Sequence, residues 1–301
     1  MKTTANNLGH TVAGIAPRPG SAAPLSVPPE SMRPDRPEVM NSLGSSPRIE
    51  IDRGCVLECL VGRHNQARNL TTGLVTFAPA AELRYHLHPF SESITLLQGQ
   101  AVVEVEGRDY ELAPLDNLLI PRETAHAARN LSPTDAAVFH VALATHNPTR
   151  TLVDSPSATR PAPPGSSGAP AAERVNRFQA AHCSSAGPNT EFIDFFNRDL
   201  MPGIEMSGGY GLFHHAGRLP AHVHDFDESI CIIRGTATCV VEGRRYSLRD
   251  GATALVPRGR VHYFVNESAG PMAMLWVYAG PVPERIVVDE RCATAEGNPW
   301  R

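Results

Sequence analysis

Histidine and glutamate residues form the same pattern at two places in this chain of 301 residues. In each place a His-x-His pair is followed four residues later by a glutamate, and a third histidine comes forty residues after the first. Three imidazoles and one carboxylate form a ligand set that divalent transition metals accept. Each set therefore predicts a metal site. The two sets, offset by 136 residues, are His86, His88, Glu92 and His126, and His222, His224, Glu228 and His262.

These ligands need β-strands to bring them together. Side chains alternate between the faces of a strand, so both histidines of each His-x-His pair project to the same side. We expect the glutamate to return from the next strand and the third histidine to come from an opposing strand. Four protein ligands leave two positions open in an octahedral shell. Those positions suit an enediol, a 2-oxo acid or a catechol, with the metal polarising a substrate oxygen or activating dioxygen.

The ligand types do not select one metal. Fe, Mn, Ni, Co and Zn all accept imidazole and carboxylate, so we expect a divalent transition metal of this group, with up to two ions per chain. An isolated His-x-His pair is more often a surface or core pair without a metal. Here the glutamate, the third histidine and the duplicated spacing favour a metal site.

Four further residues are candidates for catalytic roles, each with a structural alternative. Arg122 and Arg258 each follow a proline and would reach a substrate carboxylate, or else be solvated on a turn. Arg84 has even spacing from His86 and would face the metal, or else lie at a solvated strand end. His140, which aligns with Trp276 at the constant offset, would shuttle protons or be a satisfied core residue.

The two patterns belong to a longer internal repeat. Residues 84–130, aligned without gaps on 220–266, share 19 identities in 47 positions, which indicates a duplication. Short strands are predicted at 93–97, 101–106, 110–112 and 117–120, with a Glu-Gly-Arg turn at 106–108 and its equivalent at 242–244. Strands at this spacing predict a small sandwich or barrel in each repeat.

Composition places boundaries around the repeats. Residues 1–46 are rich in Pro, Gly and Ser and predict a disordered segment, and 155–175 predict a linker of the same kind. These boundaries give a first domain at 47–154, a second at 176–290 and a tail at 291–301. Phe192, Phe195, Phe196 and Leu200 follow Asn189-Thr190-Glu191, and this pattern predicts a short helix between the barrels that ends at Pro202-Gly203.

The overall composition is that of a globular protein. Hydrophobic residues make up 42%, charged residues 19%, and the net charge is −4, which disfavours nucleic acid as a partner. The N-terminus shows no signal-like apolar run, and eighteen consecutive apolar residues occur nowhere, so we expect no membrane partner. The six cysteines show no paired motif. Reduced thiols in a cytoplasmic protein are the expectation.

The spacing of the repeats resembles the two motifs of the cupin family, Gly-x5-His-x-His-x3-Glu-x6-Gly and Gly-x5-Pro-x-Gly-x2-His-x3-Asn. All eight ligand positions match, together with Gly99, Pro121 and Asn130 and their equivalents Gly235, Pro257 and Asn266. The first motif's leading glycine is replaced by Ala80 and Ala216, and Leu115 and Glu123 replace glycines of the second motif in repeat one. The resemblance implies an all-β bicupin, with a double-stranded β-helix (jelly-roll) barrel in each repeat.

The resemblance leaves several functions open. We expect a metal-dependent enzyme acting on a small oxygenated organic acid, either an oxidoreductase of dioxygenase type or an isomerase. The segment from Phe192 to Phe213 is similar to the inter-barrel segment of the bicupin isomerase of bacilysin biosynthesis. The alternatives are a non-catalytic small-molecule-binding bicupin with structural metals, and a decarboxylase. Exposed barrel edges often pair, which predicts a possible homodimer.

Overall fold

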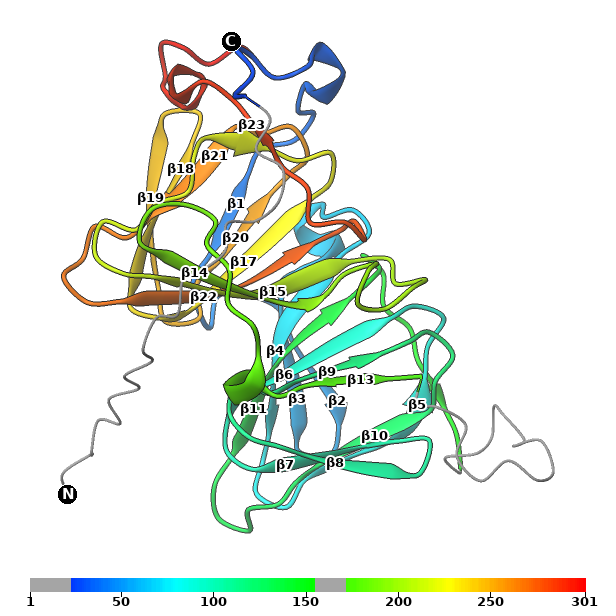
Figure 1. Ribbon diagram of the computed structural model, residues 1–301. Helices are drawn as coiled ribbons and strands as arrows, with labels where there is room; N and C mark the ends of the chain where they lie inside the picture. The colour runs from blue at the N-terminus through cyan, green and yellow to red at the C-terminus, as the bar shows by residue number, and fades with distance from the viewer. Residues whose placement is uncertain (1–22, 155–171) are drawn as a thin grey trace.

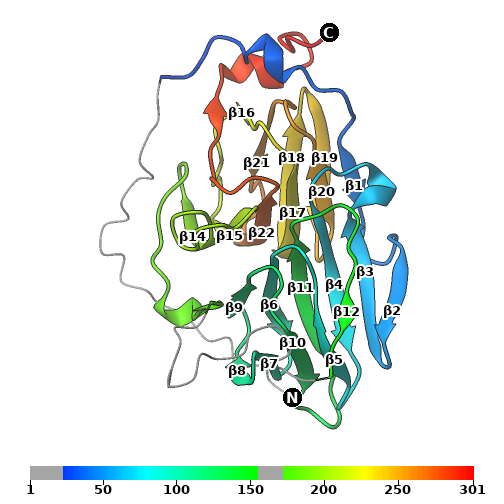
Figure 2. The ribbon, with the colours of Figure 1, turned by 90° about the vertical axis from the view of Figure 1, so that its right-hand side faces the viewer.

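A computed structural model describes residues 23–154 and 172–301. Its regular structure consists of β-strands and four short 3-10 turns, and the described residues contain no α-helix. Figures 1 and 2 show two barrels, one above the other, with the first repeat forming the lower barrel and the second repeat the upper one. The predicted all-β fold with two jelly-roll barrels is confirmed.

Each barrel is built from two antiparallel sheets. The first barrel pairs a seven-stranded sheet with a five-stranded sheet. In spatial order the larger sheet contains β13 (Arg174–Asn176), β9 (Asn117–Ile120), β6 (Glu92–Gln98), β11 (Ala137–Leu143), β4 (Thr71–Phe77), β3 (Cys55–Val61) and β2 (Arg48–Asp52). The smaller sheet contains β12 (Thr151–Leu152), β5 (Glu82–Leu87), β10 (His126–Asn130), β7 (Ala101–Val105) and β8 (Arg108–Leu112).

The second barrel repeats this plan with six and five strands. Its larger sheet contains β1 (Val39–Asn41), β20 (Thr253–Val256), β17 (Glu228–Arg234), β22 (Met272–Tyr278), β15 (Ser207–Phe213) and β14 (Thr190–Phe196). Its smaller sheet contains β19 (Arg244–Arg249), β18 (Thr236–Val241), β21 (His262–Val265), β16 (His222–Val223) and β23 (Ile286–Val287). The 3-10 turns are η1 (Glu30–Met32), η2 (Arg63–Asn65), η3 (Phe178–Ala180) and η4 (Glu290–Ala293).

The strands predicted within the repeat are present as β6, β7, β8 and β9. The turn between β7 and β8 consists of Glu106 and Gly107, both with positive φ, and Val105 pairs with Arg108 across it. A two-residue turn of this kind matches the twist of the strands that it joins. Glu242 and Gly243 have the same conformation in the second barrel, so the shared turn chemistry gives the same hairpin twice.

The three largest apolar clusters of the described residues lie in and between the barrels. One fills each barrel, with Phe77 and Phe139 in the first and Phe213 and Trp276 in the second. The third lies between the barrels, where Leu119 and Ala142 of the first pack with the second barrel's residues. The central strands of the large sheets are therefore covered on both faces.

The predicted inter-barrel helix is wrong, because residues 190–196 form strand β14. This strand pairs with β15, and its register shifts between Asp194 and Phe196. Phe192 packs inside the second barrel, whereas Phe195 and Phe196 pack in the cluster between the barrels. A strand covered on both faces and carrying such an irregularity loses its simple alternation of apolar and polar residues, and here the result imitated a helical stripe.

The disorder predicted for residues 1–46 is wrong for 23–46, which we call the N-terminal arm; residues 1–22 lie outside the described part. Strand β1 of this arm pairs with β20 of the second barrel, at the other end of the chain (Figure 1). Its Glu38 carboxylate accepts hydrogen bonds from Arg244 Nε at 2.6 Å and from the Tyr246 hydroxyl at 2.8 Å.

The predicted linker ends earlier than expected. Residues 155–171 lie outside the described part, but residues 172–183, which we call the linker arm, are packed on the first barrel, where β13 pairs with β9. Its Glu173 carboxylate accepts hydrogen bonds from Arg108 Nε at 2.7 Å and from the Tyr110 hydroxyl at 2.5 Å. Each barrel is thus completed by an arm that precedes the other barrel in sequence.

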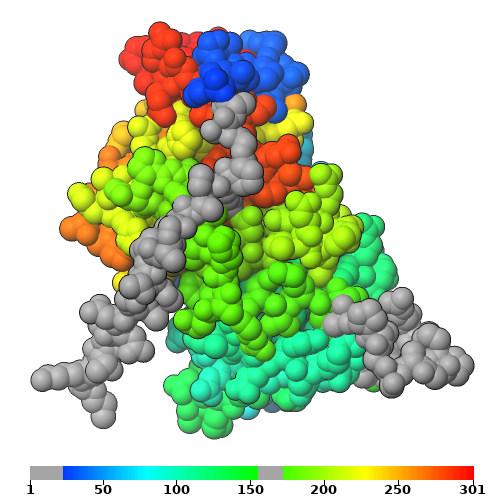
Figure 3. All heavy atoms as spheres, in the orientation of Figure 1, coloured from blue at the N-terminus to red at the C-terminus, as the bar shows by residue number. Residues whose placement is uncertain are grey.

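The tail at 291–301 packs on the second barrel. Cys292 and Ala293 are buried, and Trp300 Nε1 donates to the Gly259 carbonyl at 3.2 Å. Figure 3 shows this tail and the N-terminal arm side by side over the upper end of the molecule. No helix in residues 23–154 and 172–301 is long and apolar enough to cross a membrane.

Candidate metal centres

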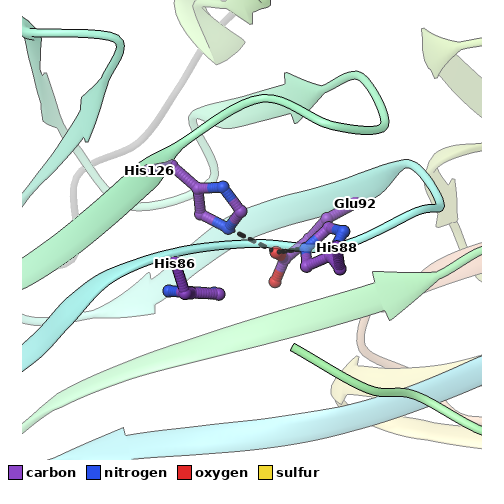
Figure 4. A group of neighbouring side chains, drawn as sticks. All are labelled: His86, His88, Glu92 and His126. Carbon is purple, nitrogen blue, oxygen red and sulfur yellow. Dashed lines mark hydrogen bonds and ion pairs between the residues drawn. The ribbon is translucent and has the colours of Figure 1, made fainter. Parts of the chain in front are cut away.

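The first set of predicted ligands converges inside the first barrel (Figure 4). His86 lies near the end of β5 and His88 just beyond it, while Glu92 and His126 are the first residues of β6 and β10. Glu92 Oε2 lies 2.9 Å from His88 Nε2 and 3.0 Å from His126 Nε2. All four side chains are buried, and one ligand atom from each lies within 4.8 Å of the others.

The second set forms an equivalent group in the second barrel. Glu228 Oε2 lies 2.7 Å from His262 Nε2 and 3.3 Å from His224 Nε2. His222 pairs with His262 across β16 and β21, as His86 pairs with His126 across β5 and β10. These four ligand atoms also lie within 4.8 Å of one another. The structure therefore brings together all eight residues that the sequence singled out.

Backbone carbonyls orient all six imidazoles. A carbonyl oxygen only accepts hydrogen bonds, so each Nδ1 carries a hydrogen and each Nε2 turns its lone pair towards the centre. This is the orientation that partners behind a metal-bound histidine normally impose. The carbonyls belong to Arg84, Phe90, Thr124, Pro220, Glu284 and Arg260, at 2.6–2.9 Å from the Nδ1 atoms of His86, His88, His126, His222, His224 and His262 respectively.

Burial and charge shift the pKa values within the two groups. Burial would raise the pKa of the Glu92 carboxyl, but hydrogen bonds with His126 and His88 outweigh it and hold that pKa well below its usual value. The Glu228 carboxyl is affected in the same way by His224 and His262, with a pKa of about 2. Burial and the neighbouring His126 lower the pKa of His86 to about 3. Both glutamates are therefore anionic, and His86 is neutral.

The donor atoms fit a metal ion. The backbone carbonyls take up the Nδ1 hydrogens, so each Nε2 approaches the glutamate, to within 2.7–3.3 Å, either with an added proton or with a lone pair that a shared cation would satisfy. In the second group, the buried Nε2 atom of His222 makes no hydrogen bond with any described residue. A buried acceptor without a partner costs about 1–3 kcal/mol, and one cation would satisfy all four ligand atoms of a group.

The arginine candidates lie away from the metal groups. Arg122 pairs with Glu205 Oε1 at 2.8 Å, and Arg258 pairs with Asp225 Oδ1 at 2.5 Å. Arg84 is exposed and its Nε donates to Asp52 Oδ2 at 3.0 Å. The expectation that Arg84 shares the face of His86 is wrong, because the register of β5 with β10 shifts between Leu83 and His86. All three arginine side chains thus form ion pairs with carboxylates outside the metal groups.

His140 faces away from the first metal group. Phe139, Val141 and Leu143 of the same strand line the interior, so His140 points to the other face of the sheet. Its alignment with Trp276 is also wrong. Leu143 pairs with Glu92 and Tyr278 pairs with Glu228, which makes Val141 the structural equivalent of Trp276 and Leu275 that of His140. The connection after Asn130 is one residue longer than that after Asn266, and a one-residue slip changes the face.

A cavity of about 290 Å³ adjoins the first metal group. Its walls are mainly apolar, and they also include His86, His88, Glu92 and Arg150. Arg150, which the sequence analysis did not single out, donates through Nη2 to the Ile51 carbonyl. No motif marks it, because it lies in the connection before β12, outside the repeat.

The comparisons with known proteins agree with this architecture. The family profile described as "Cupin domain" matches residues 73–142 and 212–278, once in each barrel. The oxalate decarboxylase of Lactobacillus farciminis, solved as its formate complex, is 16% identical and superposes with a TM-score of 0.68 over 89% of this chain and 94% of its own. That of Bacillus subtilis at pH 4.6 is 14% identical, with a TM-score of 0.67 over 87% and 81%. At these identities the likeness concerns the fold.

Two curated proteins match shorter stretches. "Polyketide synthase CurC" of Streptomyces cyaneus is 29% identical over 85 residues, which cover 28% of this chain and 55% of that protein. "Endoribonuclease YbeY" of Myxococcus xanthus is 41% identical over 51 residues, 17% of each chain. The chain thus spans about half or less of these relatives. With a cupin domain in each of two barrels, the chain is a bicupin of the cupin superfamily.

Proposed function

We propose that this bicupin is a metal-dependent enzyme that acts on a small oxygenated organic acid, as a dioxygenase or an isomerase. The observation that carries the proposal is the buried group of three oriented imidazoles and one anionic carboxylate beside a cavity in the first barrel. A bound transition ion would supply Lewis acidity and two positions for substrate oxygens.

The chain's own residues prepare that chemistry. The backbone carbonyls fix the tautomer of each imidazole, so its Nε2 is available as a ligand without rearrangement. Glu92 adds a negative charge that offsets part of the ion's charge, and its lowered pKa makes it a weak general base. The apolar walls exclude water, which strengthens polar interactions inside the cavity.

The named relatives support oxygenated substrates. The solved neighbours are oxalate decarboxylases, and they bring decarboxylation in as the second candidate reaction. The matched protein of Streptomyces cyaneus is named a polyketide synthase, and polyketides carry keto and enol oxygens that chelate metals. Both kinds of molecule present two oxygens at chelating distance.

Metal analysis tests the proposal first. Protein purified without added metal should hold up to two transition ions per chain, one for each group. His88→Ala should remove the first ion and His224→Ala the second, because each loses one of four ligands. The matched control is His64→Ala, which changes an exposed histidine outside both groups and should keep both ions. Absence of metal, with no change in thermal stability on adding Fe, Mn, Ni, Co or Zn, would refute the proposal.

Turnover assays then separate the reactions. A panel of 2-oxo acids, enediols and catechols is incubated with the metal-loaded protein, and oxygen consumption, carbon dioxide release and isomerisation are followed in parallel. Oxygen consumption indicates a dioxygenase, carbon dioxide release without it a decarboxylase, and a rearranged product with neither an isomerase. Two bound ions without any turnover would favour the non-catalytic binding alternative.

A further inference from the structure

The two metal groups have different surroundings although their ligands agree. In the first barrel Leu143 pairs with Glu92 and Val141 pairs with Ile94. In the second barrel Tyr278 pairs with Glu228 and Trp276 pairs with Ile230 at the same places. Two aliphatic side chains of the first barrel are thus replaced by two large aromatic side chains in the second.

These aromatic rings pack around the second metal group. The Tyr278 ring lies 4.4 Å from the His224 ring, 4.9 Å from the Trp276 ring and 5.1 Å from the Phe226 ring, measured between centroids. Trp276 and Tyr278 are both almost fully buried. Ring contacts at these distances leave little room beside His224 for a further molecule.

The first barrel keeps this space open. Its cavity of about 290 Å³ is several times the volume of a water molecule and suits a ligand of one or two rings. The apolar side chains on its walls include Ile49, Leu57, Val75, Phe77, Phe139 and Val141. Ile49 is 54% exposed, which places one end of the cavity at the surface.

Few charged side chains line the cavity. Among the described residues that line it, Arg150 is the one side chain with a fixed positive charge, and Glu92 is the one carboxylate. A small dianionic ligand held at the metal group would make no contact with the apolar walls. A ligand that also carries an apolar ring would cover these walls and gain the free energy of burying them.

We propose that the first barrel holds the binding centre for the organic ligand, and that this ligand combines two adjacent oxygens with an apolar ring body. The oxygens would bind the ion that His86, His88, Glu92 and His126 hold, and the ring body would lie against Val141 and Phe139. The second barrel's ion is enclosed by protein. This inference rests on the proposed function for its metal, but the apolar cavity is a separate observation.

A ring-size series tests the inference. Zinc-loaded protein is titrated with catechol, 2,3-dihydroxynaphthalene and oxalate by calorimetry; zinc is redox-inactive, so no turnover interferes. The first two compounds share a chelating head, so their affinity ratio reports the ring body. We expect 2,3-dihydroxynaphthalene to bind roughly tenfold or more tightly than catechol because the second ring buries more apolar surface, and to saturate at one molecule per chain.

The matched variants place the aromatic residues of the second barrel at the equivalent positions of the first. Val141→Trp should bring the ratio close to one with zinc content unchanged, because the indole fills the space of the second ring. The control is Val138→Trp, which places the same ring on the other face of β11, where Val138 is partly exposed and outside the cavity lining. Leu143→Tyr is the second filling variant, used if Val141→Trp fails to fold.

The outcomes are distinct. A ratio near one in the unaltered protein, a ratio unchanged in both filling variants, oxalate as the tightest ligand, or two molecules bound per chain would each overturn the inference. Failure of the proposed function appears separately, as a lack of bound zinc. In that case the fluorescence of 2,3-dihydroxynaphthalene, titrated into metal-free protein and its Val141→Trp variant, still decides whether the cavity accepts the ring body.

Discussion

The loops that carry the two ligand glutamates are anchored differently. In the second barrel Asp227, next to Glu228, accepts two hydrogen bonds from Arg36 of the N-terminal arm, at 2.9 and 2.8 Å, and one from the Arg68 amide of the first barrel at 2.7 Å. The Asp227 and Arg36 side chains are almost completely buried.

The equivalent residue in the first barrel is Ser91, next to Glu92. Its hydroxyl donates to Glu205 Oε2 at 2.5 Å, and the half-buried Glu205 also pairs with Arg122 at the surface. The second loop is therefore fixed by a buried ion pair and the first by one hydroxyl group. The interiors of the two barrels differ in the same sense. The enclosed second centre has the loop with more anchoring hydrogen bonds, and the first centre, which adjoins the cavity, has the loop with fewer.

The largest expected effect comes from breaking the buried ion pair. Asp227→Ala leaves the Arg36 guanidinium buried without its partner and should lower the free energy of unfolding by about 3–5 kcal/mol. Ser91→Ala, the matched change in the first barrel, should cost only about 1–3 kcal/mol. Chemical denaturation of both metal-loaded variants measures the two values. Equal losses would show that the two loops are held equally firmly.

A smaller effect concerns His140, whose place in the second barrel is taken by Leu275. Burial lowers the pKa of His140 to about 4, so unfolding below its ordinary value of 6.5 takes up a proton. The free energy of unfolding therefore falls as the pH drops from 6.5 to about 4, and this term vanishes above 6.5. The shift corresponds to a loss on the order of 3 kcal/mol at pH 4.

His140→Leu removes that term, so the variant should lose less stability than the unaltered protein between pH 7 and pH 4. Denaturant titrations at both pH values measure the difference, in which all shared titrating groups cancel. Leu275→His is the converse variant and should add the same pH dependence to the second barrel. Parallel pH profiles for His140→Leu and the unaltered protein would contradict the assignment.

The smallest effects concern the two arms. Burial raises the pKa of both Glu38 and Glu173, but hydrogen bonds from Arg244 and Arg108 respectively outweigh it, so both pKa values lie below 4.5. Each carboxylate therefore stabilises the fold above pH 4.5, and this contribution is lost as the pH falls through the lowered value. Glu38→Gln and Glu173→Gln should each cost about 1–3 kcal/mol at pH 7 and less in acid.

Thermal or chemical unfolding at pH 7 and pH 4 checks both arm variants. Glu267→Gln is the control, because Glu267 and Arg245 form an exposed pair that should contribute less than about 1 kcal/mol. Because the bonds of the two arms match, we expect similar losses from both. A loss from one variant only would show that the arms contribute unequally to the two barrels.

The sequence predicted what repeats at a constant spacing. The eight ligands, the hairpin at Glu106 and Gly107, and the strands that carry them follow from local patterns that each barrel preserves. The errors occur where tertiary context decides. Arg84 was misplaced by a register shift in β5, and His140 by a single added residue in a connection, and neither irregularity leaves a signal in the sequence.

The arms were missed for a different reason. Their composition is poor in large apolar residues, and short edge strands are stable only on a sheet that already exists. One signal was present: Glu38 and Asn41 recur as Glu173 and Asn176 at an offset of 135 residues. Asn41 and Asn176 donate to equivalent carbonyls, those of Leu60 and Phe195. A search that allowed the offset to change by one residue would have extended the repeat into both arms.

The exchange of arms has a consequence for how the protein is made. The N-terminal arm leaves the ribosome before either barrel, yet Val39 finds its partner only when Leu255 has been synthesised. The first barrel likewise waits for the linker arm before the edge at β9 is covered. Pairings between such distant residues slow folding. A nascent chain truncated between the barrels should therefore expose an unpaired sheet edge and depend on chaperones. A single proteolytic cut between the barrels should leave the two halves of the mature protein associated, because each arm stays paired with the other half.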